Sequence, residues 1–101
     1  NEESFMKYFA GDVDPVKARI LYAVQGRVST SLFSGRTTVA AWRSKAAWYQ
    51  ISTNDKTISP ELQRFMADRM KARTIELASS HVSLISHPQE ITGLIVEAAS
   101  A

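Results

Sequence analysis

AWYQISTNDKTISPELQRFMADRMKARTIELASSH, residues 47–81, is the stretch that decides the fold. Residues 47–53 are rich in aromatic and β-branched side chains, which favour a strand. Ser59-Pro60 predicts the start of a helix over 60–71, because serine caps a first turn and proline suits its first position. Residues 73–77 alternate polar and apolar side chains and predict a second strand. A helix that crosses between two strands in this way joins parallel neighbours by a right-handed connection.

The predicted helix 60–71 has apolar side chains at helical spacing, and we expect the face that they form to be buried against the sheet. This apolar face consists of Leu62, Phe65, Met66 and Met70. Polar side chains of the same helix are expected to face solvent, namely Glu61, Arg64, Asp68 and Lys71.

A further helix is predicted to begin at His87-Pro88, where we expect the histidine to act as a polar cap. Its apolar face consists of Ile91, Leu94, Ile95 and Ala98. Residues 47–99 therefore predict strand, helix, strand and helix, which is an α/β fold class. Because two parallel strands alone do not form a stable sheet, we expect them to be the end of a larger sheet whose other strands lie elsewhere.

The first 46 residues predict helices and no further strand. Residues 2–10 place aromatic and methionine side chains at helical spacing, and Asp14-Pro15 predicts the start of a second helix. Residues 37–43 predict a short third helix. The chain therefore divides into a helical segment, 1–46, and an α/β part, 47–101.

Composition and charge exclude several classes of function. With 101 residues, 45% hydrophobic and 22% charged, the chain is long enough for one small globular domain. The net charge is only +2 and the basic residues are scattered, so no nucleic-acid partner is expected. The sequence lacks an apolar stretch of the about 18 residues that a membrane span needs, so no membrane partner is expected either.

Cysteine and histidine usage narrows the chemistry further. The absence of cysteine excludes disulfides and thiolate ligands, and two histidines are too few for a histidine-rich metal site. The sequence has no cysteine and no signal-peptide pattern, and we therefore expect a cytoplasmic protein.

Two polar residues follow the predicted strands, Asp55 after the first and His81 after the second. In open parallel sheets the functional loops cluster at the carboxyl ends of the strands, so these two side chains can face each other. An aspartate beside a histidine orients the imidazole and stabilises the imidazolium that forms during general-base catalysis. The structural alternative is that Asp55 forms an Asx turn and that His81 caps a strand end.

The same residues resemble the carboxyl-terminal portion of the α/β-hydrolase superfamily. WYQISTNDKTISP, residues 48–60, is similar to the late strand, acid turn and helix start of that family, and SSHVSLISHP, residues 79–88, to its histidine loop and final helix. The front of the chain, with Gln25 and AWRSK at 41–45, resembles the end of the helical cap in a bacterial branch related to plant methylesterases and hydroxynitrile lyases. The resemblance covers essentially the whole chain.

The resemblance implies a Ser–Asp–His triad in which Asp55 is the acid and His81 the base. The nucleophile elbow, G-x-S-x-G, and the oxyanion-hole loop of the family are absent from the sequence. The resemblance therefore implies that an amino-terminal part of the hydrolase supplies both, either upstream or as a separate chain. It also implies a small-molecule ester or related carbonyl substrate, with no metal and no organic cofactor.

Two alternatives to an esterase stay open. One is a lyase or a cofactor-free haloperoxidase on the same scaffold, and the other is a non-catalytic fragment. Val82 stands where the resembling plant lyases have a lysine after the catalytic histidine, which favours a hydrolase. A G-x-S-x-G segment upstream or in a companion chain would distinguish an enzyme from a fragment.

Overall fold

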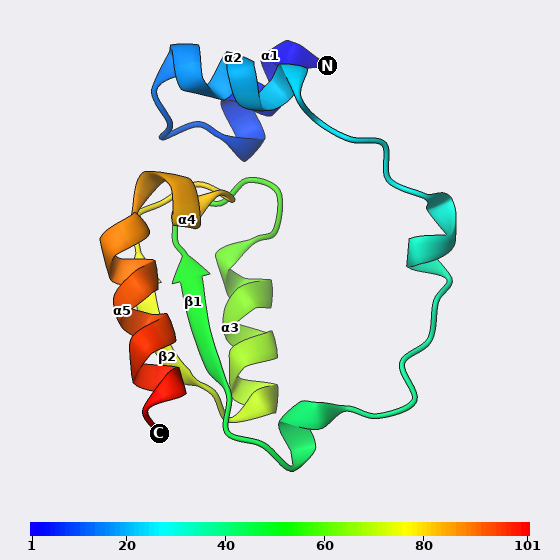
Figure 1. Ribbon diagram of the computed structural model, residues 1–101, viewed down its shortest axis with the longest axis vertical. Coiled ribbons are helices and arrows are strands. Elements are labelled where there is room, and N and C mark those ends of the chain that lie inside the picture. Colours follow the sequence, from blue (N-terminus) through cyan, green and yellow to red (C-terminus); the bar gives the residue numbers. More distant parts are fainter.

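The computed structural model describes residues 1–101, and at its centre lies the crossover that the sequence predicts (Figure 1). Strand β1 (Trp48–Ser52) pairs in parallel with β2 (Arg73–Leu77) over five residue positions. Helix α3 (Pro60–Met70) connects the two strands. The prediction of two adjacent parallel strands is confirmed, and the chain is a small α/β structure with a two-stranded sheet.

Helices cover both faces of the strand pair. Helix α5 (Pro88–Ala99) lies on one face, where Trp48 Nε1 donates to a carboxylate oxygen of Glu97 at 3.0 Å, and the short α4 (Ser83–Ser86) lies beyond the carboxyl end of β1 (Figure 1). Because alternate residues of a strand point to opposite faces, the buried Ile51 points to the other face, on which α3 packs. The short α4 is an element that the sequence did not predict.

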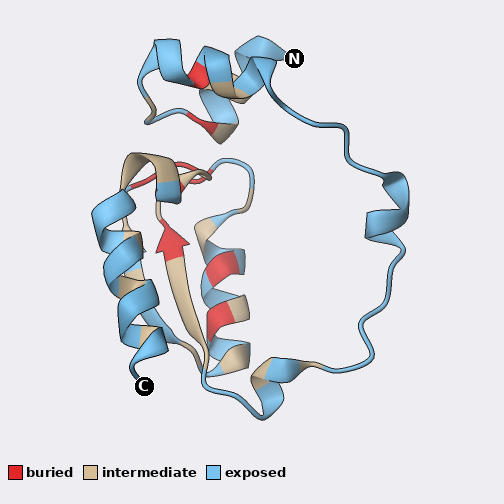
Figure 2. Cartoon of the chain, in the orientation of Figure 1, coloured by how far each residue is buried: buried red, intermediate tan, exposed pale blue.

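Helix α3 is rotated relative to the sequence-based expectation. Its buried residues are Gln63 and Ala67, with 4% and 1% of their surface exposed, whereas Leu62 and Phe65 are 49% and 60% exposed. The expectation that these two apolar side chains are buried is therefore wrong, while the expected polar residues do face solvent. The sheet is only two strands wide, and the helix turns Gln63 toward it because this side chain has its hydrogen-bond partners there. Figure 2 shows buried residues on α3, at the carboxyl end of β1 and in the loops beyond it, with others in the amino-terminal segment.

The amino-terminal segment forms a helical pair above the carboxyl end of the sheet (Figure 1). Helix α1 (Glu2–Ser4) continues into a π-helical stretch, Phe5–Phe9, and α2 (Pro15–Ala23) packs against it. The predicted helices at both places are confirmed, and the Asp14 side chain accepts hydrogen bonds from the first amides of α2, as a cap does. None of the helices in the chain combines the length and the apolar character that crossing a lipid bilayer requires.

Residues 24–40 run away from both helical layers in an extended path (Figure 1). They contain one short 3₁₀ turn, Thr30–Phe33, and a second turn, Ala41–Arg43, follows them. The prediction of a helix over 37–43 is wrong for its first four residues, since Thr37, Thr38 and Val39 are β-branched and disfavour helix. This segment exposes large apolar side chains, namely Val24, Val28, Leu32, Phe33 and Val39.

Candidate functional site

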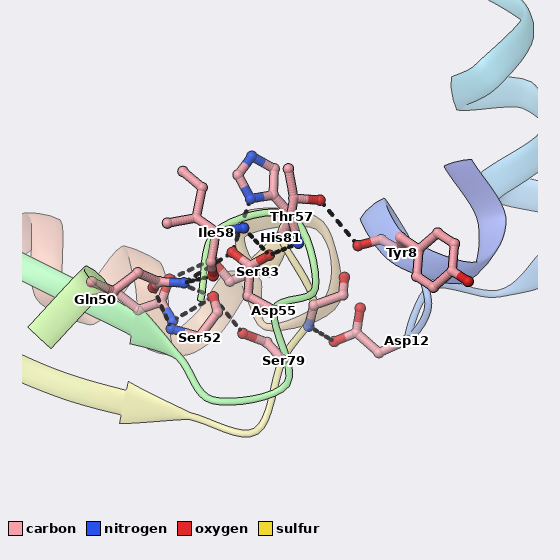
Figure 3. A network of polar contacts seen from close by, with 12 residues as sticks. Tyr8, Asp12, Gln50, Ser52, Asp55, Thr57, Ile58, Ser79, His81 and Ser83 are labelled. Carbon is pink, nitrogen blue, oxygen red and sulfur yellow. Dashed lines mark hydrogen bonds and ion pairs between the residues drawn. The ribbon is translucent and has the colours of Figure 1, made fainter. Parts of the chain in front are cut away.

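Asp55 and His81 meet at the carboxyl end of the sheet. Asp55 lies in the turn after β1 and His81 in the loop after β2, 26 residues apart in sequence. The imidazole Nδ1 lies 2.9 Å from the carboxylate Oδ2 (Figure 3). The predicted hydrogen-bond contact between the two side chains is therefore confirmed, and the catalytic role of the pair stays a prediction.

The Asp55 carboxylate uses its two oxygens for different tasks. Oδ1 accepts hydrogen bonds from the backbone N–H groups of Thr57 at 2.8 Å and Ile58 at 3.0 Å, which is an Asx-type turn. Oδ2 makes no contact within this turn and faces the His81 imidazole. The turn that the structural alternative predicts is thus present, and it fixes the carboxylate so that its other oxygen faces the histidine.

Asp55 is ionised at neutral pH. Burial raises the pKa of this carboxyl group, but hydrogen bonds from His81 and from the amides of Ile58 and Thr57 outweigh burial and hold the pKa below its ordinary value of 3.8. An ionised carboxylate accepts hydrogen bonds and cannot donate them, so the proton between the two side chains resides on Nδ1 of His81. In the neutral imidazole this leaves Nε2 unprotonated and able to accept a proton.

The His81 ring is partly open to solvent, with 27% of its side chain exposed. One neighbour is the Phe9 ring, whose centroid lies 4.7 Å from that of the imidazole. Asp55 is the only residue with which the imidazole forms a hydrogen bond, and no serine of the chain bonds to it. The imidazole thus has the geometry of a general base with an unoccupied nitrogen.

Gln63 is a residue of the site that the sequence analysis missed. Its side-chain Nε2 donates to Asp55 Oδ2 at 3.0 Å, and its Oε1 accepts from the backbone N–H of Ser52 at 2.9 Å. The spacing of residues in helix 60–71 does not single out this glutamine, because the apolar pattern assigns the buried face to its neighbours. Gln63 is recognised as part of the site only in the structure, where this polar side chain lies on the buried face of α3 and bonds to Asp55.

The helical pair at the amino terminus contacts both functional loops. Thr57 Oγ1 donates to the carbonyl oxygen of Tyr8 at 3.0 Å, and Asp12 Oδ2 accepts from the backbone N–H of Ser80 at 3.0 Å (Figure 3). Burial raises the pKa of Asp12, but the nearby Ser80 and Ser86 side chains and the Ser80 backbone N–H, which donates to this carboxylate, outweigh burial and lower the pKa overall. The loop that carries the histidine is therefore held from the amino-terminal segment.

His87 lies outside the acid–base pair. It makes no side-chain cap hydrogen bond to α5, so the expectation of a cap is wrong. Its Nδ1 lies 3.5 Å from Glu90 Oε1 and its Nε2 lies 3.9 Å from Asp12 Oδ2. The ring thus lies near two carboxylates and makes no hydrogen bond to either.

The lowered pKa of Asp55 predicts how acid affects stability. A carboxyl group whose pKa is lower in the folded state than in the unfolded state stabilises the fold at any pH above its unfolded-state pKa. This contribution is lost as the pH falls through its folded-state pKa. We expect the free energy of unfolding, measured by urea denaturation, to fall as the pH drops below 3.8. The Asp55→Asn chain should lose stability less steeply, because the asparagine does not titrate. Equal slopes for both chains would contradict the prediction.

Comparisons of the chain with protein-family models, with curated proteins and with solved structures find no match. The relationship to α/β hydrolases therefore stays a resemblance carried by the two loops. The contact between Asp55 and His81 is independent of that resemblance, since it is a feature of the fold itself.

Proposed function

We propose that the chain supplies the acid and the base of a serine-type hydrolase of the α/β-hydrolase kind, which acts on a small ester. The observation that carries the proposal is the 2.9 Å contact between Asp55 Oδ2 and His81 Nδ1, beyond the carboxyl ends of two parallel neighbouring strands. The nucleophilic serine and the oxyanion donors lie outside these residues. We call this chain, together with the segment that bears that serine, the completed hydrolase.

The geometry of the pair suits acyl transfer. His81 Nε2 accepts the proton of the attacking serine as the bond from serine oxygen to the carbonyl carbon forms, and returns it to the departing alcohol as the ester bond breaks. Asp55 holds the imidazole by Nδ1 and stabilises the imidazolium between these two transfers. Water then attacks the acyl-serine by the same route, with His81 as base, to release the acid.

The chain has uncovered surfaces, and these favour the proposal that a further part of the fold packs against it. β1 has a strand neighbour on one edge only, and an exposed parallel-strand edge leaves backbone groups unpaired. Beside it, a hollow of about 520 Å³ separates α3 from residues 40–43 and is lined mainly by apolar side chains. These lining residues are Ala40, Trp42, Arg43, Tyr49, Met66, Arg69 and Met70. A sheet that continued past β1 would cover such a surface.

Covalent labelling tests the proposal. The upstream coding sequence, or a companion chain, is searched for a G-x-S-x-G segment, and the completed hydrolase is treated with a fluorophosphonate probe. We expect one labelled serine, located in that segment, because only a serine beside an activated imidazole reacts readily with such a probe. The Ser→Ala variant of the same segment should lose the label.

Other outcomes contradict the esterase or replace it. A completed protein that cleaves cyanohydrins but not small esters would favour the lyase, and one that halogenates would favour the haloperoxidase. A label on a serine of this chain would contradict the proposal, which places the nucleophile outside the chain. No label on any serine, in a folded protein, would leave the chain a non-catalytic fragment.

A further inference from the structure

Every hydrogen-bonding group of the Gln63 side chain is used. The residue is 4% exposed, and its Oε1 accepts from the N–H of Ser52 at 2.9 Å. Its Nε2 donates twice, to the carbonyl oxygen of Ile58 at 2.8 Å and to Asp55 Oδ2 at 3.0 Å. The amide of Gln63 thus connects α3 to the end of β1 and to the turn that carries Asp55.

The two backbone partners fix which end of the amide faces Asp55. If the amide were flipped, its oxygen would oppose the Ile58 carbonyl, and its nitrogen would oppose the Ser52 N–H, so both bonds would be lost. Nε2 must therefore face the carboxylate, and Gln63 can only donate to it. This orientation follows from main-chain groups and does not depend on the charge of Asp55.

Four donors then surround one carboxylate. Oδ1 receives the amides of Thr57 and Ile58, and Oδ2 receives Gln63 and His81. A carboxylate offers about four lone-pair sites, so this set fills them. Rotation of the carboxylate away from the imidazole would break several of these bonds at once.

We propose that Gln63 is a positioning residue, whose amide holds Asp55 Oδ2 in the place from which it orients the His81 imidazole. The catalytic consequence of this role rests on the proposed function, but the positioning itself does not. A glutamine that only ties α3 to β1 would have the bond to Ser52 and no effect on the acid–base pair. The two roles are separable by a substitution that keeps the first bond and reverses the second.

Gln63→Glu is that substitution. It preserves the size of the side chain and an acceptor for the Ser52 N–H, but it places a carboxylate where a donor faced Asp55. Two carboxylates this close cannot both be ionised without repulsion, so one of them binds a proton at higher pH than Asp55 does in the wild type. While that proton is bound, the new side chain can still donate to Asp55 Oδ2. Once the pH is high enough to release the proton, we expect the hydrogen bond between Asp55 and His81 to weaken.

Proton NMR of the 101-residue chain measures this effect without any turnover. The Nδ1–H of His81 should give a downfield resonance in the wild type, and Gln63→Glu should shift it upfield or broaden it. Urea denaturation shows in parallel that the variant is folded. A resonance that stays unchanged in the folded variant, both below and above the pH at which the shared proton is released, would overturn the proposal.

A wild-type measurement keeps the test decisive if the variant does not fold. The Nε2 proton that Gln63 donates to Asp55 and the Nδ1 proton of His81 should shift with one common midpoint as Asp55 titrates, because both protons are bonded to the same carboxylate oxygen. A Gln63 proton at Asp55 that does not follow this titration would overturn the proposal.

In the completed hydrolase, Gln63→Glu should lower kcat by roughly 10- to 100-fold with little change in KM. It should also move the acid limb of the pH–rate profile to higher pH. The proposed function fails if the wild type does not turn over any ester. The positioning role of Gln63 fails if the NMR spectra give either of the contradicting results described for them.

Discussion

Replacing His81 by alanine in the completed hydrolase should lower kcat for a small ester by roughly 10³-fold or more. The reason is that the serine loses the group that accepts its proton and returns it to the leaving alcohol. The side chain is partly exposed and bonds only to Asp55, so its removal should cost little stability. Steady-state kinetics and urea denaturation of the same preparation measure the two effects separately.

His87→Ala is the matched control for this substitution. His87 also contacts carboxylates and is similarly exposed, at 29% of its side chain, but it has no contact with Asp55. We expect its variant to retain nearly wild-type turnover. If His87 proves essential and His81 dispensable, the assignment of the base is wrong.

Asp55→Asn should reduce kcat to a similar extent, because it changes the atom that bonds to His81 Nδ1. The amide can still accept the Thr57 and Ile58 hydrogen bonds at Oδ1, so the turn should persist. Its side-chain NH₂ stands where Oδ2 accepted, so it loses the hydrogen bond from Gln63 and can donate to His81 Nδ1. That donation favours the imidazole tautomer with the proton on Nε2. A base protonated on that nitrogen cannot take the serine proton. Turnover close to the wild type would contradict the role given to Asp55.

The sequence predicts the strand pair and the acid–base contact because both follow from local rules. Proline after serine marks the start of α3, and alternation marks β2. Once the crossover is fixed, the handedness of such connections brings the residues after both strands to one edge. Asp55 and His81 could therefore be paired from their positions directly after the strands.

The sequence does not predict which face of α3 is buried, because apolar periodicity assumes a sheet wide enough to cover it. Here the polar Gln63 faces the sheet and bonds to Asp55, while Leu62 and Phe65 stay exposed. Periodicity also assigns no special place to Gln63, whose partners Ser52 and Asp55 are known only once the turn is built.

Contacts between the amino-terminal segment and the site are equally hidden in the sequence. Phe9 meets His81, and Asp12 meets Ser80 across 68 residues, with no shared motif to link them. Such pairs depend on how a helical pair docks on two loops, which no local propensity encodes. The segment 1–24 therefore contributes to the site in a way that its helical pattern alone does not indicate.

The 101-residue chain alone should hydrolyse p-nitrophenyl acetate no faster than its two histidines do as free imidazoles. In triad enzymes, loss of the nucleophile lowers kcat by about 10⁶-fold, and loss of one oxyanion donor lowers it by about 10²–10³-fold. This chain has an oriented imidazole but no serine bonded to it. A stopped-flow trace at 400 nm (roughly the absorbance band of p-nitrophenolate) should therefore show a single slow phase without a burst.

The histidine variants decide where the residual rate of the isolated chain comes from. If both imidazoles act only as solution nucleophiles, His81→Ala and His87→Ala should each remove a part of the slow rate, in proportion to the exposure of the ring. Adding the serine-bearing segment should then raise the rate by several orders of magnitude, and only the His81→Ala chain should abolish the gain. A burst that labels a serine of the isolated chain would contradict the division of the triad, because the nucleophile would lie among these residues after all.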